Sequence, residues 1–280
     1  GLMNWWLVFK HQDYFESFGR PPLLQHTWSL GVEAQYYLLW PLILYFVLKV
    51  FGKKVIPTAA LSIATISGAA LFLASIRADI SSTQDVSHVY FGTDTHSIGL
   101  FLGSALAVSW IPQNLRLNIE KRAQDFIDFI GVFGLLGLLA AFLFIQEADP
   151  TAYRIAFPLV GIFGSAIIMS IVHPASRFAP LLQNPFLVWI GERSYAIYLW
   201  HWIVFQLTRP AQDITGSPWA LYAFRILVVF ALADISQRWI EIPVRNGAIS
   251  NWVRGMKYRT KEVQRRQKAT AGLVALALLS

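Results

Sequence analysis

The stretch GVFGLLGLLAAFLFI, residues 131–145, decides the fold class of this chain. Its apolar residues do not alternate with polar ones, as they would along a strand of a membrane β-barrel. Extended to about 20 residues, an apolar run of this kind is long enough for a helix to cross the hydrocarbon core of a bilayer. The stretch therefore predicts a membrane-spanning helix.

Similar apolar runs recur along the whole chain, separated by short polar breaks. They predict spans at 30–49, 55–76, 96–111, 127–146, 152–172, 186–207 and 218–239, with the start of an eighth at 268–280. The fold class we expect is all-α, a polytopic transmembrane helical bundle forming one domain over residues 1–280. Because the chain begins with Gly1 and its last run is about half a span, we expect a fragment cut at both ends.

The composition agrees with a lipid environment. The chain of 280 residues is 55% hydrophobic and only 14% charged, against about 25% in an ordinary soluble domain. It has no cysteine, which removes disulfides and thiolate ligands, and we expect no bound metal or cofactor. The net charge of +7 does not indicate nucleic acid, because the basic segment lacks interleaved aromatic residues beyond Tyr258.

The basic residues are divided unequally between alternate loops, which orients the bundle. One side receives 16 of them and the other side 5. The richer side carries Lys49, Lys53, Lys54, Arg116, Lys121, Arg122, Arg177, Arg193, Arg245, Arg254, Lys257, Arg259, Lys261, Arg265, Arg266 and Lys268. The positive-inside rule makes that side cytoplasmic and predicts a multi-pass protein of the cytoplasmic (inner) membrane.

The most informative polar residues lie in HTWSLGVEAQYYLLWP, residues 26–41. Ser29, Glu33 and Tyr37 recur every four residues and so share one face of a helix. A charge inside a span costs roughly 2.5–3.5 kcal/mol and therefore needs a partner or a task. A structural alternative is that Ser29 caps the helix while Glu33 complements the helix dipole.

A second constellation lies in IGERSYAIYLWHW, residues 190–202. Ser194, Tyr198 and His201 share one helix face, where hydroxyl groups can orient the imidazole. A buried structural histidine is the plainer alternative. Counted at 1.5 Å per residue, His201 and Glu33 both fall in the outer half of the membrane, and we expect them to face a common cavity.

A third polar group precedes the predicted span at 96–111. Here Asp94 and Thr95 are candidate helix caps, and Asp94 and His96 are candidate substrate contacts. Among the remaining charges, Asp234, Arg238 and Glu241 share a face and predict structural pairing, with contact between Arg238 or Arg245 and an anionic donor left open. The sequence indicates no partner for Arg225.

Three of these stretches resemble the acyltransferase family 3 membrane O-acetylases. They are HTWSLGVEAQYYLLWPLIL (26–44), YFGTDTHSIGLFLGSALA (90–107) and IGERSYAIYLWHWIVF (190–205), supported by WIEIPVR (239–245). The resemblance maps Ser29, Glu33 and Tyr37 onto the family's serine, glutamate and tyrosine, and His201 onto the histidine of its late helix. The family's first helices, with a histidine and an arginine pair, have no counterpart here, and the C-terminal run resembles members that continue into an extracytoplasmic SGNH hydrolase-like domain.

The resemblance implies transfer of an acyl group, usually acetyl, from cytoplasmic acyl-CoA to a hydroxyl of a cell-surface glycan such as peptidoglycan, lipopolysaccharide or exopolysaccharide. The partners we expect are acyl-CoA, the glycan acceptor and the lipid bilayer. We expect three catalytic residues, Glu33, His201 and His26, and seven substrate-binding residues, Ser29, Tyr37, Trp28, Asp94, His96, Ser194 and Tyr198. The alternatives are a proton-coupled transporter or flippase using Glu33 and His201 as a relay, and a membrane anchor or scaffold.

Overall fold

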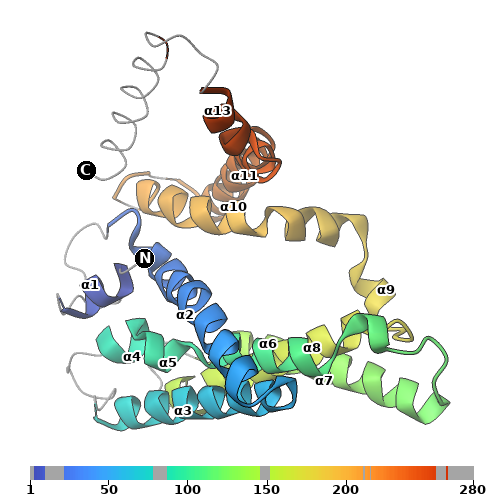
Figure 1. Ribbon diagram of the computed structural model, residues 1–280. Coiled ribbons are helices and arrows are strands. Elements are labelled where there is room, and N and C mark those ends of the chain that lie inside the picture. Colours follow the sequence, from blue (N-terminus) through green and yellow to red (C-terminus); the bar gives the residue numbers. More distant parts are fainter. Residues whose placement is uncertain are drawn as a thin grey trace. The chain divides into compact units, whose positions relative to one another are not determined.

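The computed structural model describes residues 3–9, 22–77, 87–145, 152–210, 212–214, 216–256 and 263. Throughout this part of the chain the regular elements are helices, and the one isolated β-bridge joins Pro210 to Ile214. The all-α class is therefore confirmed (Figure 1). The chain forms two compact units, 1–191 and 192–280, each described here by itself.

The first unit contains most of the helices. In chain order these are α1 (Met3–Phe9), the 3-10 turn η1 (Gln25–Thr27), α2 (Trp28–Val50), η2 (Lys53–Val55), α3 (Ile56–Arg77), α4 (Ser87–Phe91), α5 (Thr93–His96), α6 (Ile98–Ser109), η3 (Pro112–Asn114), α7 (Lys121–Phe144), the π-helical η4 (Ala152–Ala156), α8 (Phe157–Val172) and α9 (Ala179–Leu182). Helix α10 (Pro185–Leu207) leads into the second unit, which continues with α11 (Pro218–Ser236), the π-helical η5 (Gln237–Glu241), α12 (Ile242–Arg245) and α13 (Ala248–Met256).

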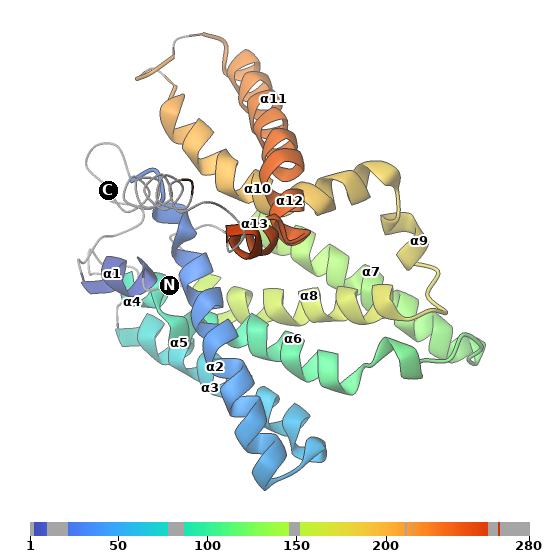
Figure 2. The ribbon, with the colours of Figure 1, turned by 45° about the horizontal axis from the view of Figure 1, so that its top comes forward.

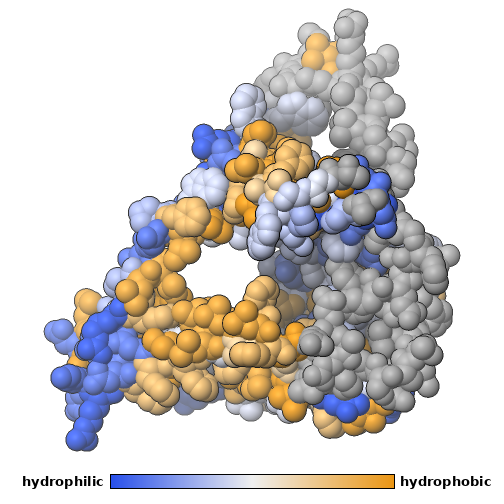
Figure 3. All heavy atoms as spheres, turned by 180° about the vertical axis from the view of Figure 1, so that it is seen from behind, coloured by the Kyte–Doolittle hydropathy of each residue, from blue (hydrophilic) through white to orange (hydrophobic). Residues whose placement is uncertain are grey.

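Five helical stretches among the described residues are long and apolar enough to cross a membrane, and they establish a multi-pass protein. They are Gln25–Val50, Lys53–Arg77, Lys121–Phe144, Tyr153–Val172 and Pro218–Arg245. Large side chains such as Phe142 and Phe144 are exposed on them, as expected for surfaces that face lipid. Figure 3 shows hydrophobic side chains over much of the described surface. The predicted spans at 96–111 and 186–207 correspond to α6 and α10, which are not among these five stretches; α6 has only 12 residues, and the eighth run lies outside the described residues.

Helices α7 and α8 pack closely because glycines on α7 remove the side chains that would separate them. A Cβ at Gly134 would lie 2.8 Å from the Phe163 carbonyl oxygen, and a Cβ at Gly131 would lie 2.5 Å from Ser170 Oγ. The GVFGLLG segment that predicts a span also supplies its contact face.

At the predicted outer end of the first unit, α3, α4, α5 and η4 meet around a small apolar core. Leu71, Val89 and Tyr153 form this core and are almost fully buried. The nearby Arg154 donates from Nε to Ser75 Oγ at 3.3 Å. The N-terminal turns of α2 lie beside this assembly in both views (Figures 1 and 2), and that is where the candidate site is built.

In the second unit, α10 and α11 form an antiparallel pair joined by polar contacts at both ends. At one end Arg193 Nε lies 2.8 Å from Asp234 Oδ1, and Asp234 Oδ2 lies 2.9 Å from Arg238 Nε. At the other end Arg225 donates from Nε to Thr208 Oγ1 at 2.9 Å and from a terminal nitrogen to the Thr208 carbonyl. The pairing of Asp234 with Arg238 confirms the sequence expectation, and Thr208 supplies the partner of Arg225 that the sequence did not indicate.

Candidate functional site

The first polar constellation lies where α2 begins. The helix starts at Trp28, so Ser29, Glu33 and Tyr37 all lie within it, as the four-residue spacing predicts. The capping alternative for Ser29 is wrong, because the N-cap residue is Thr27 and makes no side-chain capping bond. Glu33 is partly buried, whereas Tyr37 is 67% exposed within its unit.

Glu33 lies on a different side of α2 from the residues that pack against α1 and α5, while Tyr36 and Trp40, further along the helix and nearer its own side, pack against Phe101 of α6. The packed face carries Gly31, Val32 and Gln35, which at 100° per residue are well separated from Glu33. Within the described part of the chain, the structure shows no hydrogen bond or ion pair to the Glu33 carboxylate. Both carboxylate oxygens are therefore available as acceptors for a ligand hydroxyl.

Aromatic rings hold the start of α2 against α4 and α5. The Trp28 ring lies 5.2 Å from Tyr90, 5.4 Å from Phe91 and 5.1 Å from His96, measured between ring centroids. His96 also contacts Phe157 at 5.5 Å. Trp28 and His96, two of the predicted site residues, are 68 residues apart in the sequence. The structure brings their rings into direct contact.

A hydrogen-bond network behind this aromatic cluster fixes the relative positions of α1, α2 and α5. Gln35 Nε2 donates to Asn4 Oδ1 at 2.9 Å, Asn4 Nδ2 donates to Thr93 Oγ1 at 2.9 Å, and Thr93 Oγ1 donates to Gln35 Oε1 at 2.7 Å. Trp5 Nε1 also donates to Gln35 Oε1, at 3.1 Å. Because Asn4 is fully buried, this closed ring of bonds satisfies groups that would otherwise be expensive to desolvate.

The segment around α5 positions two further candidate side chains of the first unit, Asp94 and His96. Asp94 Oδ1 lies 3.1 Å from His88 Nε2, and the Asp94 carbonyl accepts a bond from Ser67 Oγ at 2.7 Å. Desolvation lowers the pKa of His96 to about 4, against the opposing effect of the Asp94 charge, so the imidazole is neutral at pH 7. The capping role considered for Asp94 and Thr95 is wrong, since Gly92 and Ser97 occupy the N-cap positions of α5 and α6.

His26 lies in the 3-10 turn that precedes α2 and is buried. The structure therefore places it at the same end of the unit as Trp28 and His96. It could reach a substrate only if the packing around this turn opened.

His201 lies in the second unit, on α10. Its Nδ1 is 2.6 Å from the Tyr198 carbonyl oxygen, which can only accept, so Nδ1 carries the proton and donates it. This bond fixes the tautomer and makes Nε2 the basic nitrogen. The Tyr198 ring lies 5.7 Å from the imidazole and is tilted by 42° to it, and Ser194 is exposed one turn earlier. Because Glu33 and His201 belong to different units, their convergence on one cavity stays a prediction.

The second unit also contains a cavity of about 390 Å³, at the end of α11 predicted to be cytoplasmic. Apolar side chains of α10, η5 and α12 line most of it, and Glu241 and Arg245 are its charged lining residues. The π-helical turn η5 contributes Ile240 and Glu241 to this lining. π-helical insertions of this kind are frequent at functional sites.

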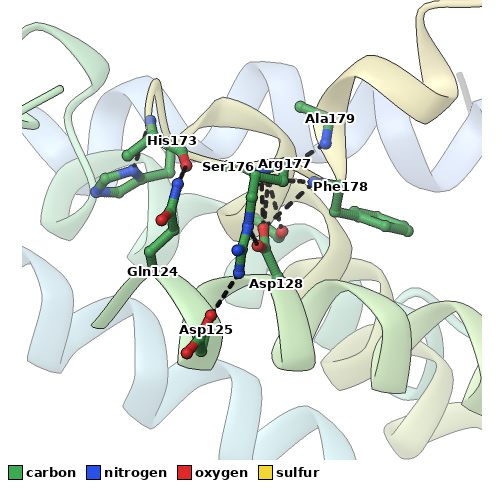
Figure 4. Close-up of polar contacts among 10 residues, drawn as sticks. Gln124, Asp125, Asp128, His173, Ser176, Arg177, Phe178 and Ala179 are labelled. Carbon is green, nitrogen blue, oxygen red and sulfur yellow. Dashed lines mark hydrogen bonds and ion pairs between the residues drawn. The ribbon is translucent and has the colours of Figure 1, made fainter. Parts of the chain in front are cut away.

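A cluster that sequence reasoning missed joins α7 to the connection between α8 and α9 (Figure 4). Asp128 of α7 accepts bonds from the backbone nitrogens of Arg177 and Phe178 at 2.9 and 3.2 Å and pairs with the Arg177 guanidinium at 2.7 Å. Asp125 pairs with the same guanidinium, and the hydrogen bonds that Arg177 donates to both carboxylates raise its pKa. The cluster ties the α8–α9 connection to α7. Its signal in the sequence was two carboxylates three residues apart at the edge of an apolar run.

Among the described residues, no group of three histidine or acidic side chains is placed to bind a metal ion. Glu33, His96 and His201 themselves offer acid–base, hydrogen-bonding and electrostatic chemistry.

Comparison with known proteins decides the family. The family model described as "Acyltransferase domain" matches residues 2–238, most of the chain. The chain belongs to this acyltransferase family. The resemblance inferred from the three sequence stretches is therefore confirmed.

Relatives of this acyltransferase domain include named O-acetyltransferases. The peptidoglycan O-acetyltransferase OatA of Listeria monocytogenes is 33% identical over 257 residues, which cover 91% of this chain and 40% of that protein. The O-acetyltransferase OatA of Staphylococcus aureus is 36% identical over 245 residues, covering 87% and 40%. The putative peptidoglycan O-acetyltransferase YrhL of Bacillus subtilis is 31% identical over 284 residues, covering 99% and 44%.

The chain thus spans about two fifths of the length of these curated relatives. No solved structure matches it. Sequence reasoning also missed Asn4, Thr93 and Arg193, each of which bonds to a polar group on another helix. Polar residues in an apolar run were the only signal for them, because their partners are distant in sequence.

Proposed function

We propose that this acyltransferase domain O-acetylates peptidoglycan or a related cell-surface glycan. The acyl group would come from a cytoplasmic acyl-CoA, most simply acetyl-CoA, across the cytoplasmic membrane. The thioester C–S bond breaks, an ester C–O bond forms on the glycan hydroxyl, and the hydroxyl proton ends on the released thiol. The observation that carries the proposal is the family match over residues 2–238, together with relatives named as O-acetyltransferases.

The acceptor side of the reaction is assigned to the start of α2. Glu33 acts as general base or stabilises positive charge beside the reacting hydroxyl, and its carboxylate lies free of the hydrogen bonds and ion pairs found among the described residues. Ser29 and Tyr37 share its flank and supply hydrogen bonds to the sugar. Trp28 offers an apolar ring edge on which a pyranose can rest, and the neutral His96 beside it contributes a nitrogen for hydrogen bonding.

His201 is the second proposed acid–base group. Its Nδ1–H bond to the Tyr198 carbonyl leaves Nε2 as a proton acceptor in a defined orientation. In this scheme His201 is a second candidate base for the acceptor hydroxyl. His26 stays a candidate whose participation requires movement of the turn before α2, and Ser194, Tyr198 and Asp94 remain proposed substrate contacts.

The donor side is assigned to the cavity between α10, η5 and α12. The apolar lining of this cavity suits the acyl-bearing arm of an acyl-CoA, and the Arg245 guanidinium suits its anionic phosphates. Replacing Arg245 by glutamine is expected to raise the KM for acetyl-CoA with a smaller change in kcat. An unchanged KM would remove this arginine from donor binding.

The test of the acceptor side uses Glu33→Gln in the complete protein, expressed in cells that lack other peptidoglycan O-acetyltransferases. The readout is ester-linked acetate released from purified glycan. Because a general base contributes about 10²–10⁴-fold, acetylation should fall at least about a hundredfold. Glu120→Gln, at the exposed N-cap of α7, is the matched control and should retain full activity.

A proton-coupled transporter of a glycan precursor predicts a different result. Label from the acetyl group of acetyl-CoA would then never reach the glycan, whatever residue stands at position 33. Labelled glycan in the parent protein, lost in Glu33→Gln and kept in Glu120→Gln, separates the enzyme from the transporter and from a scaffold.

A further inference from the structure

The chain forms a short helix, α13, directly after its last membrane-spanning stretch. The span Pro218–Arg245 ends with α12, and the chain then turns at Gly247, whose φ of 83° is readily adopted by glycine. The Gly247 nitrogen donates to the Val244 carbonyl at 2.9 Å, and the Gly247 carbonyl accepts from Asn251 N at 2.8 Å. These bonds fix a sharp change of direction between α12 and α13.

Helix α13 separates its apolar and polar side chains completely. At 100° per residue, Ala248, Ile249, Trp252 and Val253 occupy an arc of about 140°. The polar side chains Ser250, Asn251 and Arg254 occupy the opposite side. Ile249 is 57% exposed and Val253 is 48% exposed, so much of the apolar arc is uncovered within its unit.

The length and charge of this segment indicate what covers that face. With 9 residues α13 rises about 13 Å, less than half of the hydrocarbon core, so it cannot span the membrane. It emerges on the side that carries 16 basic residues, and Arg254 on its polar side is followed in the sequence by Lys257 and Arg259. A short helix that directly follows a membrane-spanning stretch and has an apolar arc opposite a basic side is suited to lie on a membrane surface with negatively charged headgroups.

We propose that α13 is an interfacial helix that lies in the cytoplasmic leaflet of the membrane. Ile249, Trp252 and Val253 insert among the headgroups and the upper acyl chains, and Arg254 binds the phosphates of anionic phospholipids. The partner is the lipid surface itself. This inference is independent of the reaction that the domain catalyses.

The cysteine-free sequence makes a direct test possible, because one introduced cysteine is the only thiol in these 280 residues. Val253→Cys and Asn251→Cys differ by two positions and lie about 160° apart around the helix axis, one within the apolar arc and one on the polar side. Each is labelled with an environment-sensitive NBD maleimide, and the full chain is reconstituted in vesicles of phosphatidylcholine and phosphatidylglycerol. The emission is then quenched with brominated acyl chains and, separately, with aqueous iodide.

The expected result is that brominated lipid quenches the label at position 253 and spares position 251, while iodide in vesicles opened to both faces does the reverse. Shielding of position 253 from both quenchers would mean that the apolar face packs against protein, either this chain, a second copy or a partner. Iodide access at both positions would mean that the helix lies in water. Either outcome overturns the proposal.

The anionic component has its own measurement. Arg254→Gln in the Val253→Cys background should weaken insertion by about fivefold in the vesicles that contain phosphatidylglycerol, as expected for the loss of one basic side chain near a charged surface. In vesicles of phosphatidylcholine alone the two proteins should give equal quenching. Equal quenching in both kinds of vesicle would overturn the assignment of Arg254 to anionic headgroups.

Discussion

Replacing Gly134 by alanine tests whether the close packing of α7 against α8 holds the first unit together. An alanine Cβ at this position would lie 2.8 Å from the Phe163 carbonyl oxygen, 3.0 Å from Ile167 Cγ1 and 3.2 Å from Ala166 Cβ. Ordinary contacts of a Cβ begin at 3.4 Å. The nearest atom belongs to the backbone, so no side-chain rotation can relieve the clash, and the helices must move apart by roughly 0.6 Å.

The magnitude follows from two opposing effects. Overpacking of this kind destabilises by about 1–3 kcal/mol, whereas alanine in a helix interior is favoured over glycine by about 1 kcal/mol. Gly164→Ala in α8 is the matched control, because nothing lies within 4 Å of its Cβ position. Both variants share the propensity gain, so the difference between them, about 1–3 kcal/mol, isolates the clash.

The assay is thermal unfolding of the purified protein in detergent, followed by tryptophan fluorescence. We expect a lower Tm for Gly134→Ala than for Gly164→Ala, with the parent at or between the two. A Gly134→Ala protein as stable as the Gly164→Ala protein would refute the reasoning, since it would show that α7 and α8 do not pack through this glycine.

Three further perturbations follow from the same structure. Gln35→Ala should destabilise the protein by about 1–3 kcal/mol, because it leaves the buried side-chain oxygen Oδ1 of Asn4 without its hydrogen-bond donor. Thermal unfolding measures this change, and an unchanged Tm would contradict the prediction. Asp128→Ala should lower the Tm much more than Asp125→Ala, since only Asp128 accepts backbone N–H bonds from the α8–α9 connection, and equal shifts would contradict that ranking. The protein should lose stability as the pH drops from about 6.5 towards 4, because the unfolded chain binds a proton at His96 that the folded imidazole, with its pKa lowered to about 4, does not bind. His96→Phe should reduce this pH dependence of stability, and an unchanged pH profile would refute the reasoning.

The fold followed from the sequence because a membrane-spanning helix is encoded locally, in the length of an apolar run. Each of the seven predicted ranges contains a helix. The boundaries shifted where polar residues continue a helix beyond its apolar run, as at α7, which begins at Lys121 and not at residue 127. The short helices α1 and α13 were missed, since neither has the length that a span requires.

The site was only partly accessible to sequence reasoning. Helical periodicity correctly places Ser29, Glu33 and Tyr37 within α2, and the contact between Trp28 and His96 shows that the starts of α2 and α6 lie at one end of the unit. The network through Asn4 depends on partners 31 and 89 residues away, and periodicity carries no information about such distances. The relation of Glu33 to His201 stays a prediction for the same reason.

The bonds between Arg225 and Thr208 bear on how the protein enters the membrane. A cation in a membrane-spanning helix is costly when its hydrogen-bonding groups meet only lipid, and Arg225 is almost fully buried on α11. Its acceptors belong to the residue that follows α10, and the Phe205 ring of α10 lies 4.6 Å from the guanidinium. Biogenesis of this region is therefore energetically easiest when the two helices leave the translocon as one hairpin, so that the guanidinium is already hydrogen-bonded by its neighbour before it meets hydrocarbon.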